Sequence, residues 1–248
     1  MSITRRDAMT LGAGTALALA AGGQVASAGK NPGPAAAKTP AAGVGAGKHA
    51  PAPLPFDPKR LPGLSEKLLV SHHDNNYATA VKNLNKVELE LANVNKDTPG
   101  FLVSGLRERE LQFTNSVILH EHYFMNLGGN GKMSADVEKA IAGAYGSVAR
   151  WEELFRATAM SLGGGSGWVV LAFNFHSGDL RTYASANHTQ ALAFGQPLLV
   201  LDMYEHAYAI DYGAAHAKYI DAFFANIFVD AVDDRLERAR KAAKILGA

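Results

Sequence analysis

Histidine and carboxylate side chains are the groups with which this 248-residue chain could hold a metal. It has nine histidines and no cysteine, which excludes a disulfide scaffold, a zinc–thiolate or iron–sulfur site and a cysteine nucleophile. His72 and His122 fall on the apolar stripes of two predicted helices, and Asp202 and His206 stand four residues apart. A single such histidine is more often a core residue. Imidazoles that converge with a carboxylate, without thiolates, suit iron, manganese or zinc.

Two helices are expected to carry the first two histidines. Apolar residues recur at helical spacing from Leu64 to Val94, and a second helical stretch spans about residues 107–127. The breaker Asp97-Thr98-Pro99-Gly100 separates them, so an antiparallel helical hairpin is predicted. The expected inner stripe of the second helix consists of Leu111, Asn115, Ile118, His122 and Met125.

The second half of the chain changes character. Ser134 and Ser147 are expected to cap helices over 135–144 and 148–162. Apolar runs that end at turn residues predict three strands, and two further helices follow. The fold class is therefore α+β, a helical hairpin followed by an α/β unit with a small three-stranded antiparallel sheet. The expected strands are 168–173, 180–186 and 197–201, and the expected helices are 202–210 and 214–228.

The N-terminal segment is typical of an export signal. Arg5-Arg6 precedes an apolar run of about 13 residues, too short to span a membrane, and a small-residue site predicts cleavage after Ala28. The signal (1–28) would be followed by a disordered Ala/Pro/Gly linker (29–53), a helical hairpin domain (54–130) and an α+β domain (131–248). We expect a periplasmic or otherwise exported bacterial protein without a stable membrane anchor.

The overall charge favours no nucleic-acid partner. Lys and Arg number 24 against 23 Asp and Glu, a formal net charge of +1. A chain so balanced creates no strong positive field for nucleic acid to follow. Its hydrophobic content of 48% is enough for a buried core, which excludes disorder of the whole chain.

One motif carries a resemblance to a known family. The sequence Asp-x-x-Glu-His-Ala-Tyr at 202–208 follows an apolar strand, and His72-His73 and Glu121-His122-x-Phe124 lie on the two helices. Tyr145-Gly-Ser and Gly165-Ser-Gly-Trp also match. Together these segments resemble the iron/manganese superoxide dismutases over residues 54–235.

The resemblance implies a metal centre and a reaction. One iron or manganese ion per subunit would be held by His72, His122, Asp202 and His206. Alternating reduction and oxidation of that ion would convert the small anion superoxide to dioxygen and hydrogen peroxide. His188 matches the residue that hydrogen-bonds the metal's solvent ligand in the family.

Further residues carry expected roles around this centre. Trp168 matches an aromatic wall of the pocket, although simple core packing would also explain it. Glu205 matches a residue that pairs across a dimer interface, which implies a homodimer or homotetramer, although a solvated helix charge is equally consistent. Ile118 would fill the place of a Gln that the iron-type members carry on the second helix.

The gateway above the expected metal departs from the family. Asn76 and Ala80 stand where the family has its gateway histidine and tyrosine, Ala209 replaces the histidine's tyrosine partner, and Tyr204 replaces a Trp. Dismutation could therefore be slower, or the pocket could admit a larger substrate.

The alternatives to a superoxide dismutase are a non-haem iron or manganese enzyme with another substrate, and a non-catalytic metal-binding protein. His49 lies in the linker and is not expected to be a ligand. Of the remaining histidines without an assigned role, His73 and His120 are expected to point away from the metal; the others are His176 and His216.

Overall fold

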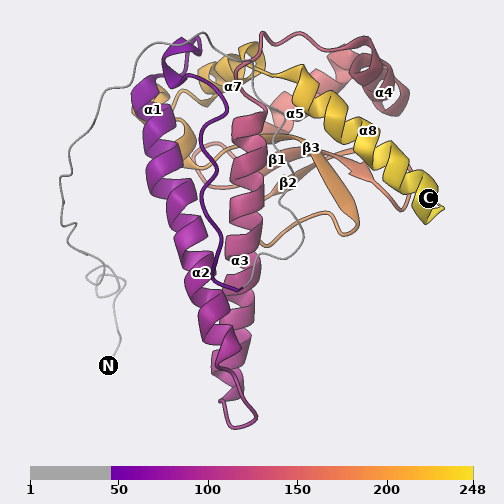
Figure 1. The fold of residues 1–248 in the computed structure, drawn as a ribbon. Helices are drawn as coiled ribbons and strands as arrows, with labels where there is room; N and C mark the ends of the chain where they lie inside the picture. Colours follow the sequence, from indigo (N-terminus) through magenta and orange to yellow (C-terminus); the bar gives the residue numbers. More distant parts are fainter. Residues whose placement is uncertain (1–45, 248) are drawn as a thin grey trace, which may run out of the picture. The chain divides into compact units, whose positions relative to one another are not determined.

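The computed structural model describes residues 46–247, so the predicted export signal and the predicted linker up to residue 45 lie outside the described residues. The described residues belong to one compact unit, in which a helical hairpin precedes an α+β part (Figure 1). The predicted fold class is confirmed. The helices are α1 (Glu66–Ser71), α2 (Ala78–Ala92), α3 (Gly100–Met125), α4 (Ala135–Tyr145), α5 (Val148–Ser161), α6 (Ala209–Tyr212), α7 (His216–Ala225) and α8 (Val229–Leu246), and the strands are β1 (Trp168–Asn174), β2 (Asp179–Ser185) and β3 (Gly195–Asp202).

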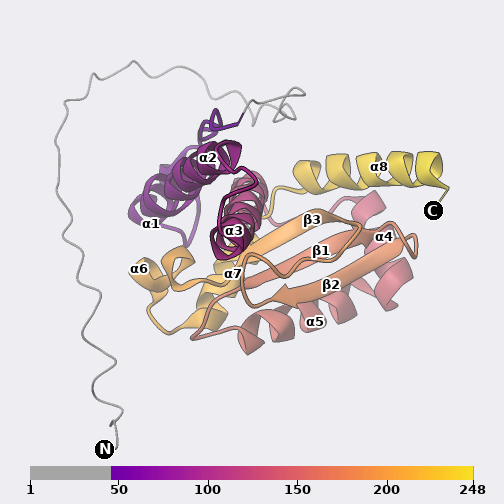
Figure 2. The ribbon, with the colours of Figure 1, turned by 90° about the horizontal axis from the view of Figure 1, so that it is seen from below.

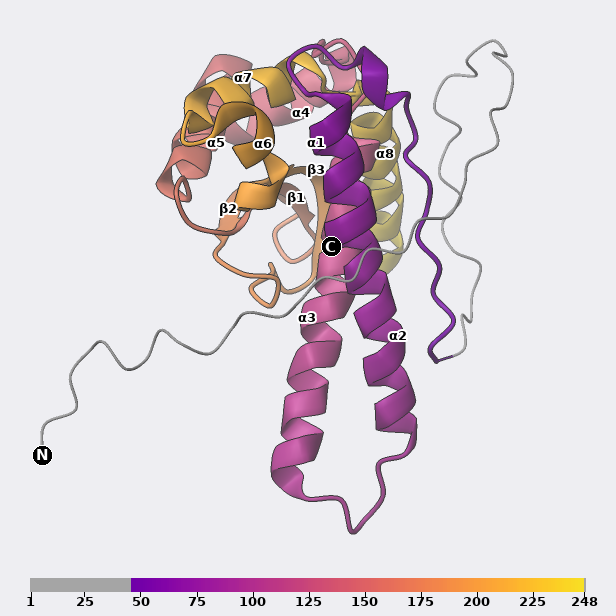
Figure 3. The ribbon, with the colours of Figure 1, turned by 90° about the vertical axis from the view of Figure 1, so that its left-hand side faces the viewer.

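The helical hairpin is built from α1, α2 and α3. A π-helical segment, η2 (His72–Tyr77), joins α1 to α2 in one continuous run, as the apolar spacing predicted. α3 begins at Gly100 directly after Pro99, earlier than the expected residue 107. Proline at this boundary does not interrupt a helix, because the first helical N–H groups have no partner within the helix. Figure 3 shows α2 and α3 running side by side well beyond the sheet.

The sheet is antiparallel with strand order β2–β1–β3, so β1 is central. Trp168 to Phe173 of β1 are all buried, since α5 packs against β1 and β2 while α3 and α8 pack against β3. Figure 2 shows α8 alongside β3 and α5 along the sheet. Trp168 pairs with Asp202 in the register of β1 and β3, which brings the expected pocket wall beside the expected carboxylate ligand.

The serine caps predicted for α4 and α5 are confirmed. Ser134 Oγ accepts a hydrogen bond from Val137 N–H, and Ser147 Oγ accepts one from Arg150 N–H. The predicted helix over 202–210 is wrong. β3 continues to Asp202 and is followed by a short 3-10 turn, η3 (Glu205–Ala207), and then by α6.

The described part of the predicted linker, residues 46–53, is held against the hairpin, contrary to the prediction of a free tether. The His49 ring lies 2.8 Å from a carboxylate oxygen of Glu88, and its backbone N–H donates to Asn85. Ala52 N–H donates to the Tyr77 hydroxyl at 2.8 Å. Side chains of η2 and α2 therefore satisfy backbone groups that water would otherwise solvate.

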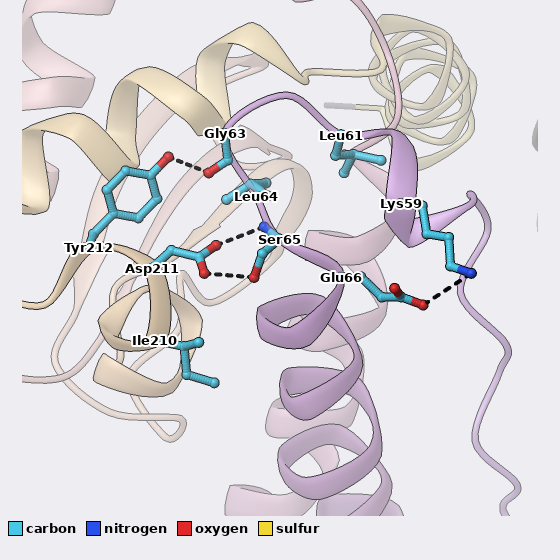
Figure 4. A pocket seen from close by; sticks show the side chains of 9 residues that line it. All are labelled: Lys59, Leu61, Gly63, Leu64, Ser65, Glu66, Ile210, Asp211 and Tyr212. Atoms are coloured by element: carbon cyan, nitrogen blue, oxygen red, sulfur yellow. Dashed lines mark hydrogen bonds and ion pairs between the residues drawn. The ribbon is translucent and has the colours of Figure 1, made fainter.

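The start of α1 is fixed by a contact from α6. Ser65 Oγ caps α1 by accepting from Leu68 N–H, and both the hydroxyl and the N–H of Ser65 donate to Asp211. Figure 4 shows the two hydrogen bonds from Ser65 to Asp211 and the hydrogen bond from the Tyr212 hydroxyl to Gly63 O. They lie in an open pocket of about 720 Å³ whose lining includes Lys59, Glu66 and Ile210.

No helix among residues 46–247 combines the length and the apolar composition needed to traverse a lipid bilayer.

Candidate metal centre

Three imidazoles and one carboxylate converge between the hairpin and the end of β3. The residues are His72 from η2, His120 from α3, Asp202 from β3 and His206 from η3, and one ligand atom from each lies within 4.8 Å of the others. The Nε2 atoms of these histidines lie 3.0, 3.7 and 3.2 Å from Asp202 Oδ2, respectively. This donor set matches the expected chemistry of imidazole and carboxylate without thiolate.

The hydrogen bonding of His120 on α3 leaves its Nε2 atom available to coordinate a metal. His120 Nδ1–H donates to Ser116 O at 2.7 Å, so the lone pair of the neutral ring is on Nε2. That Nε2 atom has no hydrogen-bond partner among residues 46–247, although only 2% of the residue is exposed. A buried polar atom without a partner is costly, and a metal ion would satisfy it. The residues present therefore fit a bound ion.

The end of β3 orients the carboxylate. Asp202 is fully buried, and its Oδ1 accepts a hydrogen bond from Tyr204 N–H at 2.8 Å. Its backbone carbonyl accepts from the hydroxyl of Tyr219 at 2.7 Å. The chain then turns through η3, which brings His206 back to the carboxylate. The i,i+4 spacing thus works across a strand end and a tight turn, whereas a shared helical face was expected.

Burial and mutual contact set the charges of the site. Burial lowers the pKa of His120 to about 3, and it also lowers the pKa of His72. Burial alone would raise the pKa of Asp202, but the imidazoles of His206 and His72 hold it well below its ordinary value. Neutral imidazoles and an ionised carboxylate are the protonation states that bind a metal cation.

The predicted ligand His122 is wrong, and His120 takes its place. His122 is half-buried, and its Nδ1–H donates to Ile118 O at 2.8 Å. Burial, together with the nearby charge of Arg235, depresses its pKa. The buried face of α3 instead carries Ser116, His120 and Tyr123. Ile118, expected in the place of a Gln, is 39% exposed, and the residue four positions before His120 is Ser116.

An aromatic layer surrounds the four groups. Trp168 packs edge-on to His120 with ring centroids 5.0 Å apart, and its Nε1–H donates to His188 Nδ1 at 2.9 Å. Tyr204 stacks on both His188 and His206. The structure thus places three of the expected pocket residues, Trp168, His188 and Tyr204, next to the metal-binding group.

The remaining expected residues occupy different environments. Asn76 is half-buried in η2, and Ala80 is buried in α2 with 5% exposure. Glu205 is exposed on η3. His73 points to Asp74 and to Ala52 O, His176 is exposed in the turn between β1 and β2, and His216 packs against Tyr208.

Comparison with known proteins identifies the family. Residues 133–235 match the family described as iron/manganese superoxide dismutases, C-terminal domain. A protein of Cupriavidus metallidurans named "Superoxide dismutase [Fe]" is 48% identical over 176 residues, which cover 71% of this chain and 89% of that protein. The chain belongs to the iron/manganese superoxide dismutase family.

Other relatives carry either metal in their names. "Superoxide dismutase [Mn] 1" of Halobacterium salinarum is 32% identical over 75% of this chain and 94% of its own length. "Superoxide dismutase [Fe]" of Aquifex pyrophilus is 34% identical over 76% of this chain and 92% of its own length. Iron and manganese dismutases are thus both represented among the relatives.

The missed ligand had a signal in the sequence. Val117, His120, Tyr123, Phe124 and Leu127 recur at helical spacing and are all buried. This stripe is as apolar as the one that contains His122, so apolar content alone did not separate the two. Asn115 and Ser185, whose side chains contact backbone carbonyls of His188 and its neighbours, gave no comparable signal.

Proposed function

We propose that this chain is an exported superoxide dismutase that uses one iron or manganese ion. The observation that carries the proposal is the convergence of three histidine nitrogens on the buried carboxylate of Asp202. His72, His120, Asp202 and His206 would hold the ion. When bound, iron or manganese supplies one-electron chemistry, so that two superoxide ions and two protons yield dioxygen and hydrogen peroxide.

The residues of the chain would bind and orient around that chemistry. Three neutral imidazoles and one carboxylate leave positive charge on a bound cation, which attracts a small anion. Trp168 Nε1–H occupies the lone pair of His188 Nδ1, so a neutral His188 carries its proton on Nε2. Among residues 46–247 no hydrogen bond engages Nε2, so this N–H group would be available to donate to the solvent ligand of a bound ion. The role of such a donor is to tune the basicity and the potential of the centre.

A dismutase assay of defined metal forms tests this function. The purified protein is loaded separately with iron and with manganese, its metal content is measured, and superoxide decay is followed by pulse radiolysis. We expect catalytic decay with at least one metal at about one ion per subunit. Stoichiometric metal binding without catalysis would support a non-catalytic metal-binding protein and refute the proposal. A matched Asp202→Asn variant controls for superoxide loss by free metal.

Export and self-association complete the proposal. The paired Arg5-Arg6, the short apolar run and the small residues before Gly29 support cleavage after Ala28. Protein recovered from cell fractions should begin at Gly29, and an Arg5→Lys/Arg6→Lys variant should accumulate with its signal uncleaved.

The exposed carboxylate of Glu205 next to the ligand His206 supports a dimer. Sedimentation of the wild type against Glu205→Ala would test it, and a monomeric wild type would refute it.

A further inference from the structure

The histidine proposed to donate toward the metal lies on a loop. His188 belongs to the segment 186–190 between β2 and β3, which has neither helix nor strand geometry. A loop residue can be placed accurately only if other elements hold it. The contacts of His188 therefore decide whether its ring has one position or several.

Side chains outside the loop hold its backbone, and one of them is Ser166, whose Oγ donates to Ala186 O at 3.2 Å. Asn115 on α3 donates from Nδ2 to His188 O at 2.7 Å, across 73 residues of sequence. The buried hydroxyl of Ser185 lies in short contact with the carbonyls of Asn187 and Gln190 on either side of His188. Asn115 precedes the ligand His120 by five residues on the same helix, so α3 positions both the ligand and this loop.

The ring of His188 is held on one edge and one face. The indole N–H of Trp168 donates to Nδ1 at 2.9 Å, which fixes the tautomer. Tyr204 stacks on the ring with centroids 4.8 Å apart and planes at 11°. The same tyrosine stacks on the ligand His206 at 5.3 Å and 10°. The planes of the three rings are therefore nearly parallel, and Tyr204 contacts both His188 and the metal-binding group.

We propose that Asn115 and Tyr204 are positioning residues that hold the His188 ring in one orientation at the metal centre. This inference rests on the proposed function, since the orientation matters only if Nε2–H acts on that centre. Asn115 fixes where the ring attaches, and the aromatic face of Tyr204 fixes its plane. The stacking area of Tyr204 supplies this constraint on the ring plane.

The nitrogen NMR spectrum of His188 in metal-free protein tests the orientation directly. The His188 signals are assigned by their loss in His188→Gln. We expect the wild type to show a single tautomer with an unprotonated Nδ1. Asn115→Ala and Tyr204→Leu should give a mixture of tautomers, whereas Tyr204→Phe should keep the wild-type pattern. Asn93→Ala is the matched control, because Asn93 also donates from Nδ2 to a backbone carbonyl, that of Leu89, at a distant helix end.

Azide binding to the ferric protein supplies a second readout. Loss of orientation around a metal site changes affinity by about 10-fold or more, so Asn115→Ala and Tyr204→Leu should shift the azide dissociation constant by that factor. Tyr204→Phe and Asn93→Ala should stay within about twofold of the wild type. Wild-type spectra and wild-type azide affinity in folded Asn115→Ala and Tyr204→Leu would overturn the inference. The NMR result does not depend on turnover. If the wild type is inactive but the two variants show altered tautomers, only the dismutase function is refuted.

Discussion

A comparison of the variants His120→Ala and His122→Ala tests which of these two histidines of α3 belongs to the metal centre. His120 supplies one of four converging ligand atoms and is 2% exposed, whereas His122 is half-buried and bonded to Ile118 O. Zinc binding at four-ligand structural sites is worth about 10–16 kcal/mol, and on the same scale one ligand accounts for roughly 3 kcal/mol. His120→Ala should therefore weaken metal binding by roughly 100-fold or more.

For His122→Ala we expect only small effects on stability and on metal affinity. His122→Ala loses one hydrogen bond worth about 1 kcal/mol of folding free energy and should leave metal affinity within about twofold. Both proteins are loaded with iron, dialysed against a graded series of chelator concentrations and analysed for retained metal. Thermal unfolding of the metal-free proteins confirms that each variant folds. Retention of metal by His120→Ala together with its loss from His122→Ala would refute the assignment.

Three other substitutions or deletions probe the surroundings of the site. Ala80→Tyr restores the family's gateway side chain at a position 5% exposed, so we expect stability to fall by about 1–3 kcal/mol and the dismutation rate to change; an unchanged rate in the folded variant argues against a gateway role. Burial lowers the pKa of His122 to about 3, so the unfolded chain binds the proton first and stability is lost as pH falls below about 6.5. His122→Leu should therefore lose up to about 2 kcal/mol less than the wild type between pH 7.5 and 5, as urea unfolding would show, and equal losses would contradict this. A chain that starts at Leu54 lacks the His49 and Ala52 contacts with the hairpin and should be about 1–3 kcal/mol less stable to urea than one that starts at Gly29; equal midpoints would mean that the segment adds nothing.

The choice between two neighbouring histidines shows the limit of periodicity. Helical spacing predicted α3 correctly, but the phase of its buried stripe was wrong by two residues, about 200° around the helix. α3 extends beyond the sheet, where Phe101, Leu102 and Leu111 are exposed. Apolar residues that cover no core weaken the link between hydrophobicity and the inward face. Tertiary packing against β3, rather than sequence pattern, selects His120.

The carboxylate and the third histidine were predicted correctly for an incomplete reason. Asp202 and His206 meet at 3.2 Å, but through the end of β3 and a 3-10 turn. Spacing in the sequence limits how far apart two residues can lie, and several backbone conformations satisfy the same limit. The pair was therefore recoverable from sequence, and the conformation that joins it was not.

The segment before the hairpin shows what composition cannot reveal. Residues 46–53 contain little apolar surface, and composition alone predicts a free tether. Apart from the His49 ring, which contacts Glu88, their attachment depends on backbone N–H and C=O groups that meet Tyr77, Asn85 and His73. Every residue except proline carries both groups, so no residue type in the segment announces such contacts.

A crystal structure of the iron-loaded protein, with anomalous diffraction measured at the iron edge, would show directly which residues hold the ion. We expect one anomalous peak per chain, with Nε2 of His72, His120 and His206 and Oδ2 of Asp202 at the bonding distance of about 2.0–2.2 Å usual for such ligands. A peak bonded to His122, or fully loaded protein with no peak among these four groups, would contradict this expectation.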